Sequence, residues 1–306
     1  MPAAPVSHAS LAGVRGLAFE GGGVLGLCYV SAIESLQRHG VDLGTVNRYA
    51  GASAGAITAA LLACGATPED MRRLWVATEF ETVFGGKARW TALRKLGGLR
   101  PLTRPRAWIR EAIASRGVDP DTPLSLLEAA TGSSLWVTAT NLEAGMTVTW
   151  GPESDLGIAD AVLASMAIPA YYQPHEIGGN HFADGGVASN LPLLELGLAP
   201  AECIGFRLDG EGDASAYDPD SIPCGLRRIA GKLALVLWGN VAALRRAANE
   251  RHVPADYWPR IVRIPTGRYG ATDWHVAQHQ PSREHLENTG RLAFERWAAT
   301  ATARGK

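Results

Sequence analysis

The stretch AFEGGGVLGL (residues 18–27) places a run of glycines between a short apolar segment and a helical pattern. Within it, Gly21, Gly23 and Gly26 spell G-x-G-x-x-G. In dinucleotide-binding proteins such a turn lets a pyrophosphate approach the N-terminus of a helix. The free backbone N–H groups of the same turn can instead stabilise an oxyanion. Taken alone, the stretch leaves both anions open.

Strand and helix patterns alternate along much of the chain. This alternation predicts an α/β fold with a substantially parallel sheet. The β-branched and apolar runs predict strands over 15–19, 47–50, 134–140, 146–150 and 202–208, and a hairpin over 175–186. The helical patterns cover 24–38, 56–65, 158–168, 226–250 and 282–303.

Bulk composition is that of an ordinary globular protein. The chain has 306 residues, 46% of them hydrophobic, and a formal net charge of −1. This length suits one large α/β domain or two small ones. The near-neutral charge gives no argument for a nucleic-acid partner.

The N-terminal sequence and the cysteines bear on location. Residues 1–16 lack the basic and apolar regions of a signal peptide, so a cytoplasmic protein is expected, although secretion without a signal would leave no trace. The four cysteines, at 28, 64, 203 and 224, form no CxxC pair. They are interpreted as structural thiols in a reducing compartment.

The strongest chemical signal is GASAG (residues 51–55), between a predicted strand and a predicted helix. A G-x-S-x-G sequence in that context is a nucleophile elbow, which raises a serine to the start of a helix. Gly51 and Gly55 flank the strained turn, and Ser53 would be the nucleophile. The alternative is a small-residue helix start with Ser53 as its N-cap.

A serine nucleophile needs a base. Four histidines follow Ser53 in the chain, as the base of an α/β-hydrolase triad does: His252, His275, His279 and His285. The better candidate is Asp184, because Gly185 and Gly186 after it free the backbone to turn away and leave the carboxylate projecting. Its alternative is an Asx-turn in which Asp184 only caps its own turn.

Together the three motifs, at 21–26, 51–55 and 184–186, resemble those of the patatin-like phospholipase family. TATNLEAGMTVTW and AVLASMAIPAYYQPHEIGG also look like the family's later segments. The resemblance implies a three-layer α/β/α patatin-like fold with a nucleophile elbow. We expect a catalytic region over 17–197, preceded by an extension (1–16) and followed by the rest of the same domain (198–306).

By this resemblance, Ser53 and Asp184 would form a nucleophile and general-base dyad. The N–H groups of Gly22 and Gly23, with that of Ala54, would form the oxyanion hole. The expected activity is hydrolysis of lipid acyl esters, as a phospholipase A, lysophospholipase or lipase, without metal or cofactor.

Two other enzyme classes fit parts of this sequence. An acyltransferase would share the acyl-enzyme, and the sequence does not separate it from a hydrolase. A dinucleotide-binding oxidoreductase needs an acidic residue closing the second strand, and the nearest, Asp42, precedes that strand. Many relatives carry Arg or Lys where this chain has Leu25, which weakens the expectation of a phospholipid headgroup.

Two further segments suggest ligands. Residues 87–110 hold eight basic and no acidic residues, interleaved with Trp90 and Trp108. They predict either contact with an anionic membrane surface or a solvated lid whose tryptophans pack in the core. The acidic loop 209–220 resembles a calcium loop but lacks the glycine at its sixth position and the glutamate at its twelfth, so a solvated connector is expected.

Overall fold

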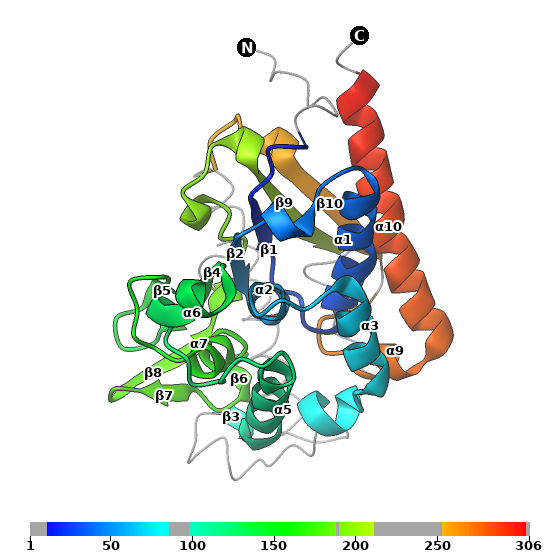
Figure 1. Cartoon of the computed structure of the whole chain (residues 1–306). Helices are drawn as coiled ribbons and strands as arrows, with labels where there is room; N and C mark the ends of the chain where they lie inside the picture. Colours follow the sequence, from blue (N-terminus) through cyan, green and yellow to red (C-terminus); the bar gives the residue numbers. More distant parts are fainter. Residues whose placement is uncertain (1–10, 86–97, 188–189, 211–252, 268, 304–306) are drawn as a thin grey trace.

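A computed structural model describes residues 11–85, 98–187, 190–210, 253–267 and 269–303. Its main sheet has the strand order β10-β9-β1-β2-β4-β8-β7, and β5 pairs with β4 (Figure 1). The five strands from β10 to β4 are parallel, whereas β5, β7 and β8 are antiparallel to their partners. The bounds are β1 Gly16–Phe19, β2 Arg48–Ala52, β4 Ser134–Asn141, β5 Met146–Trp150, β7 His175–Ile177, β8 Asn180–Asp184, β9 Cys203–Gly210 and β10 Ile261–Gly267. The predicted α/β fold with a mostly parallel sheet is confirmed.

Helices bury one face of this sheet, and α1 and α10 run side by side along one flank (Figure 1). Alternate residues of each parallel strand face opposite sides, as the period of a strand requires. Leu17 and Phe19 of β1 belong to the large core beneath the helices, whereas Ala18 belongs to a smaller cluster on the other face. The helix bounds are α1 Cys28–Arg38, α2 Ala54–Ala63, α3 Pro68–Ala77, α5 Thr103–Ala114, α6 Leu124–Thr131, α7 Ile158–Ser165, α9 His275–Gln278 and α10 Gln280–Ala303.

Short 3-10 helices complete the described structure. They are η2 Gly23–Leu27, η3 Leu43–Thr45, η5 Gly185–Val187, η6 Leu194–Leu196, η7 Pro200–Glu202 and η9 Trp258–Arg260, and a π-helical turn, η4, spans Glu81–Gly85. Leucines at 193, 196 and 198 belong to the smaller cluster. The helix predicted over 226–250 and most of the acidic loop 209–220 lie outside the described residues.

Register on β4 brings distant parts of the chain together. Thr138 pairs with Ala52 at the end of β2, and the next residue, Ala139, pairs with Asp184 at the end of β8. The residue after β2 is Ser53. The sheet therefore places the predicted nucleophile and the predicted base at neighbouring positions, although they are 131 positions apart in sequence.

Several elements differ from the sequence expectations. The predicted helix over 24–38 begins as the 3-10 helix η2, and its α-helical part starts at Cys28. Three strands were not predicted: β10, and the small pair β3 (Gly98–Arg100) and β6 (Ala170–Tyr172). β3 and β6 have only three residues each, too few to show a periodic pattern.

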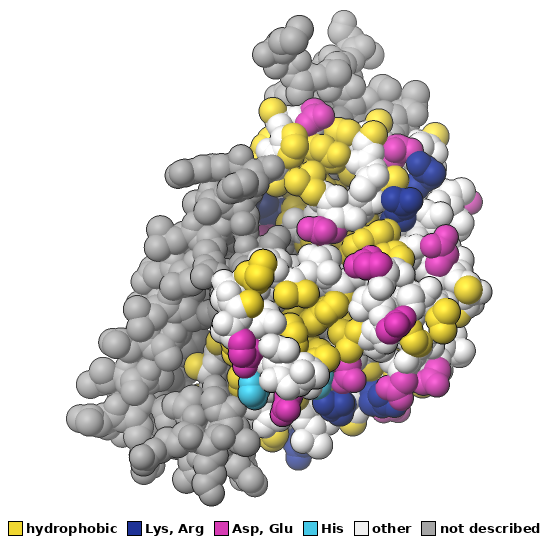
Figure 2. Space-filling model, turned by 90° about the vertical axis from the view of Figure 1, so that its left-hand side faces the viewer, with side chains coloured by type: hydrophobic (Ala, Val, Ile, Leu, Met, Phe, Trp, Pro, Cys, Tyr) yellow, Lys and Arg dark blue, Asp and Glu magenta, His cyan; other side chains and the backbone are white. Residues whose placement is uncertain are grey.

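Surface character is mixed on the face seen in Figure 2, where acidic and basic side chains are interspersed with apolar ones over the described residues. Within the described part of the chain, no helix is both long and apolar enough to cross a membrane.

Candidate active site

Ser53 stands at a strained turn between β2 and α2. Its φ of 53° and ψ of −121° are unusual for a residue with a side chain. Its N–H donates to Ser165 Oγ at 2.8 Å, and Ser165 Oγ donates to the Thr138 carbonyl at 2.6 Å. Gly55 permits the tight passage of the chain, because a Cβ there would lie 2.2 Å from the Phe19 carbonyl oxygen. The predicted elbow geometry is present.

Asp184 lies inside the protein at the end of β8, with only 4% of its surface exposed. The Gly186 N–H donates to its Oδ1 at 2.7 Å. Burial raises the pKa of Asp184 to about 6, and the Ser53 side chain and the Gly186 N–H oppose that rise. The carboxyl is thus a stronger base than a solvated aspartate and lies at the sheet position next to that of Ser53.

The glycine turn packs directly against the elbow. A Cβ on Gly21 would lie 2.9 Å from Ser53 Cβ, so no side chain fits between the two segments. Gly23 has a φ of 56°, and a Cβ there would lie 1.9 Å from the Ala271 carbonyl oxygen, which accepts a hydrogen bond from the Val24 N–H. Among the described residues, no acceptor pairs with the N–H groups of Gly22, Gly23 or Ala54.

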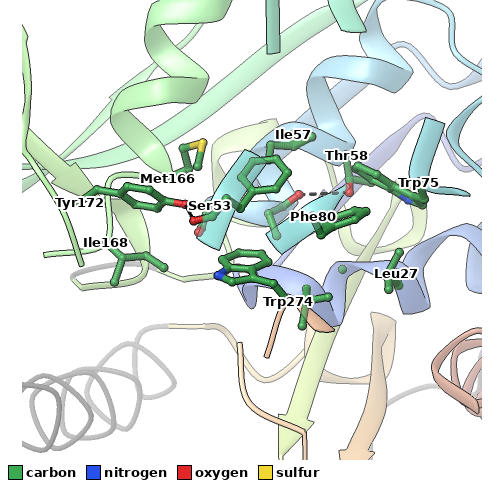
Figure 3. A pocket seen from close by; sticks show the side chains of 15 residues that line it. Leu27, Ser53, Ile57, Thr58, Trp75, Phe80, Met166, Ile168, Tyr172 and Trp274 are labelled. Carbon is green, nitrogen blue, oxygen red and sulfur yellow. Dashed lines mark hydrogen bonds between the residues drawn. The ribbon is translucent and has the colours of Figure 1, made fainter. Parts of the chain in front are cut away.

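A largely apolar cavity opens beside Ser53 (Figure 3). Its two hydroxyls besides Ser53 are occupied: Thr58 Oγ1 donates to the Ala54 carbonyl and Tyr172 OH donates to the Phe84 carbonyl. The indole N–H of Trp274 donates to Tyr171 OH at 2.7 Å. The cavity is lined by Gly23, Val24, Gly26, Leu27, Ser53, Ala54, Ile57, Thr58, Trp75, Phe80, Phe84, Met166, Ile168, Tyr172 and Trp274. It suits an alkyl chain better than a polar ligand.

The other predicted glycines are packing positions. A Cβ on Gly26 would meet Ala54 Cβ at 3.3 Å, and one on Gly51 would meet the Gly55 carbonyl oxygen at 2.2 Å. A Cβ on Gly185 would lie 2.2 Å from the Thr138 carbonyl oxygen, and the Gly186 N–H donates to Asp184. These contacts hold the three motifs against one another.

Histidines are not brought to Ser53. His275 lies in α9, His285 lies in α10, and His279 Nδ1 contacts Ser282 Oγ at 2.8 Å. No histidine among the described residues hydrogen-bonds to Ser53, and His252 lies outside them. In the part of the chain that is described, no group of three or more His, Cys, Asp or Glu residues has the arrangement of a metal site.

Two residues bear on the missing cation of the glycine motif and on the dinucleotide-binding alternative, Leu25 and Asp42. Leu25 is 7% exposed and belongs to the main core, so a cation there would be buried among apolar side chains. Asp42 is exposed, and its side chain accepts from the Gly44 N–H at the start of η3, before β2. The carboxylate that a dinucleotide-binding site needs at the end of β2 is not supplied by Asp42.

The basic segment 87–110 is described only from residue 98 onward. Trp108 stacks on Trp75 and donates from its indole N–H to Thr78 Oγ1 at 2.9 Å. Arg106 pairs with Asp160, and Arg110 pairs with Asp121. This part follows the packed alternative, whereas Trp90 and the rest of the segment before residue 98 lie outside the described structure, so membrane contact through this segment stays a prediction.

Cysteines 28, 64 and 203 are buried free thiols, and Cys224 is not described. Burial raises the pKa of Cys203 to about 11 and that of Cys64 to about 12. Neither is a nucleophile near neutral pH.

Three polar residues at the site escaped the sequence analysis. Ser165 accepts from the Ser53 N–H, Asn190 accepts from the Gly21 N–H, and Glu20 hydrogen-bonds to Asn190. The one available signal was a glutamate directly after the apolar strand in AFEGGG, since a charged residue at that point must find partners if it is buried. Ser165 and Asn190 carry no comparable signal, because serine and asparagine are common in helices and turns.

Comparison with known proteins identifies the family of this chain. A family model described as patatin-like phospholipase matches residues 17–196. The chain belongs to the patatin-like phospholipase family. Membership assigns it in general terms to the lipid hydrolases.

Two relatives of this patatin-like protein are each 26% identical to it. The uncharacterised protein YqhO of Bacillus subtilis matches over 284 residues, covering 86% of this chain and 91% of YqhO. An uncharacterised NTE family protein of Mycobacterium tuberculosis matches over 211 residues, covering 67% of this chain and 51% of the relative. The solved structure of VipD from Legionella pneumophila has a TM-score of 0.58 at 18% identity, covering 94% of this chain and 67% of VipD. That likeness concerns the fold alone.

Proposed function

We propose that this protein hydrolyses lipid acyl esters through an acyl-enzyme formed on Ser53, with Asp184 as the general base. The observation that carries the proposal is the register of β4, which sets the buried Asp184 carboxyl beside the serine of a strained elbow, and burial raises the pKa of that carboxyl to about 6. A solvated aspartate is far too weak a base for a serine hydroxyl. A dry, directly bonded one accepts the proton as the nucleophile attacks.

In the first half-reaction, Ser53 Oγ attacks the ester carbonyl and its proton passes to Asp184. The tetrahedral oxyanion is stabilised by the N–H groups of Gly22 and Gly23, with that of Ala54 at the start of α2, which have no acceptor among the described residues. Asp184 then returns the proton to the leaving alcohol or lysolipid. In the second half-reaction, water gives a proton to Asp184 while the water oxygen attacks the acyl carbon. The bond between the acyl carbon and Ser53 Oγ then breaks, Asp184 returns the proton to Ser53 Oγ, and the fatty acid is released.

The apolar cavity would hold the acyl chain. Ile57, Phe80, Met166 and Ile168 give it alkyl and aromatic walls, and its polar groups other than Ser53 are largely occupied by protein partners. Burial of each CH₂ is worth about 0.8 kcal/mol. We therefore expect preference to rise with chain length until the cavity is filled.

The test is turnover of p-nitrophenyl esters of increasing chain length by wild type, Ser53→Ala and Asp184→Asn, with and without EDTA. We expect both variants to lose at least about 10³-fold in kcat and EDTA to have no effect. Full activity in Ser53→Ala would refute the mechanism. Adding a primary alcohol as a competing acceptor separates hydrolysis from acyl transfer, because a transferase would yield the new ester in place of the fatty acid.

A further inference from the structure

Glu20 and Asn190 form a buried polar pair behind the glycine turn. Glu20 directly follows β1 and is 2% exposed, and Asn190 is 9% exposed. Glu20 Oε2 accepts from the Leu208 N–H at 2.7 Å, and its Oε1 accepts from Asn190 Nδ2 at 2.9 Å. Neither residue lines the cavity beside Ser53. A buried carboxylate is costly, so its bonding pattern points to a specific use.

We propose that Glu20 and Asn190 are positioning residues that aim the oxyanion-binding N–H of Gly22. The inference rests on the proposed function, in which that N–H stabilises the oxyanion. It adds a role for two side chains that touch neither substrate nor Ser53.

Asn190 controls the peptide that carries this N–H. Its Nδ2 donates to the Gly21 carbonyl at 3.2 Å, while its Oδ1 accepts from the Gly21 N–H at 3.1 Å. The Gly21 carbonyl and the Gly22 N–H belong to one planar trans peptide, in which they point in opposite directions. Holding the carbonyl towards Asn190 therefore directs the Gly22 N–H away from it.

Glu20 decides which end of the Asn190 amide faces the turn. A carboxylate only accepts hydrogen bonds, so Asn190 must present Nδ2 to Glu20 and Oδ1 to the Gly21 N–H. With an amide in place of the carboxylate, Asn190 can be turned around. Its Nδ2 would then meet the Gly21 N–H, donor against donor, and the turn would lose its fixed orientation.

The same asparagine links the turn to the base. A Cβ on Gly186 would lie 2.7 Å from Asn190 Oδ1, and the Gly186 N–H donates to Asp184. Asn190 thus contacts the glycine turn on one side and the loop that bonds Asp184 on the other. Through this contact, the Glu20–Asn190 pair fixes the position of the oxyanion donors relative to the general base.

The experiment measures kcat and KM for a p-nitrophenyl ester in Glu20→Gln, Asn190→Asp and the double variant. Glu20→Gln should lower kcat about 10²-fold, the effect of losing one oxyanion donor, with KM within about 3-fold. The matched control is Glu176→Gln, on the exposed part of β7, which should leave both constants unchanged.

The double variant exchanges nitrogen and oxygen across the pair at constant net charge. Its carboxylate at position 190 can accept from both the new amide at position 20 and the Gly21 N–H, but it cannot donate to the Gly21 carbonyl, so kcat should stay as low as in Asn190→Asp, about 10²-fold below wild type, with KM within about 3-fold. A structural role confined to the contact between positions 20 and 190 would instead be rescued, because the double variant restores that contact. Unchanged kcat in Glu20→Gln, or recovery of wild-type kcat in the double variant, would overturn the proposal.

Asn190→Ser covers the case in which Glu20→Gln does not fold. It removes the amide from both Gly21 groups without altering β1, and should lower kcat with KM within about 3-fold; unchanged kcat would overturn the proposal. Ser53→Ala, assayed alongside, distinguishes failure of the proposed function from failure of this inference. Turnover that survives in Ser53→Ala rejects the proposed function itself, whereas turnover that needs Ser53 but not Glu20 or Asn190 rejects this inference alone.

Discussion

Burial of the Asp184 carboxylate should affect the stability of the protein as well as its activity. Burial raises the pKa of this carboxyl from its usual 3.8 to about 6. Each pKa unit corresponds to about 1.4 kcal/mol, so the ionised side chain costs about 3 kcal/mol in the folded state. Asp184→Asn removes this cost and keeps an oxygen to accept from the Gly186 N–H.

The sign of the effect follows from which state binds the proton. Below pH 3.8 the carboxyl is protonated in both states and contributes no penalty. Between 3.8 and about 6 the unfolded chain loses its proton first, so the unfolding free energy of wild type falls as pH rises. The stability of Asp184→Asn relative to wild type should therefore increase by about 3 kcal/mol between about pH 3.8 and about pH 7.5.

Urea unfolding of both proteins across this pH range measures the difference. Asp121→Asn is the contrasting control, because its pairing with Arg110 lowers the pKa of the exposed Asp121, and loss of that pair has a small effect of opposite sign. A difference between Asp184→Asn and wild type that stays flat with pH would show that Asp184 ionises like a solvated carboxyl. Asp184 would then be too weak a base for the role proposed here.

Three further outcomes are expected. In a pH profile, kcat/KM should rise with an apparent pKa of about 6, since Asp184 must be ionised to accept the Ser53 proton; a flat profile from about pH 5 to about pH 8 would argue for another base. Gly23→Ala should lose far more activity than Gly26→Ala, because its Cβ would lie 1.9 Å from a carbonyl oxygen, against 3.3 Å from a methyl group at Gly26; equal ester turnover would contradict the geometry of the turn. Ser165→Ala leaves the buried Ser53 N–H without its acceptor and should cost about 1–3 kcal/mol in urea unfolding, and wild-type stability would show that the bond does not hold the elbow.

Much of the architecture could be predicted because it depends on sequence patterns that span only a few residues. The buried strands, the hairpin ending at Asp184 and the elbow at Ser53 all show periodicity or turn chemistry within a few residues. The small strands β3 and β6 could not be found, because three residues carry no period and their pairing depends on tertiary contact.

The chemistry of the site was only partly accessible from sequence. Ser53 and Asp184 belong to recognisable motifs, yet their juxtaposition depends on the register of β4, where successive residues pair with the ends of β2 and β8. Glu20, Ser165 and Asn190 act through single long-range hydrogen bonds, which leave no spacing to read. Leu25 was expected to matter for the headgroup, and its burial in the core accounts for its apolar character.

The central claim is that Ser53 carries the acyl group during turnover. Mass spectrometry of the protein quenched during hydrolysis of a p-nitrophenyl ester tests it directly, with peptide mapping to locate the adduct. We predict a mass increase of one acyl group on the peptide containing Ser53, absent in Ser53→Ala. An acyl group on another residue, or steady turnover that Ser53→Ala retains, would contradict the account.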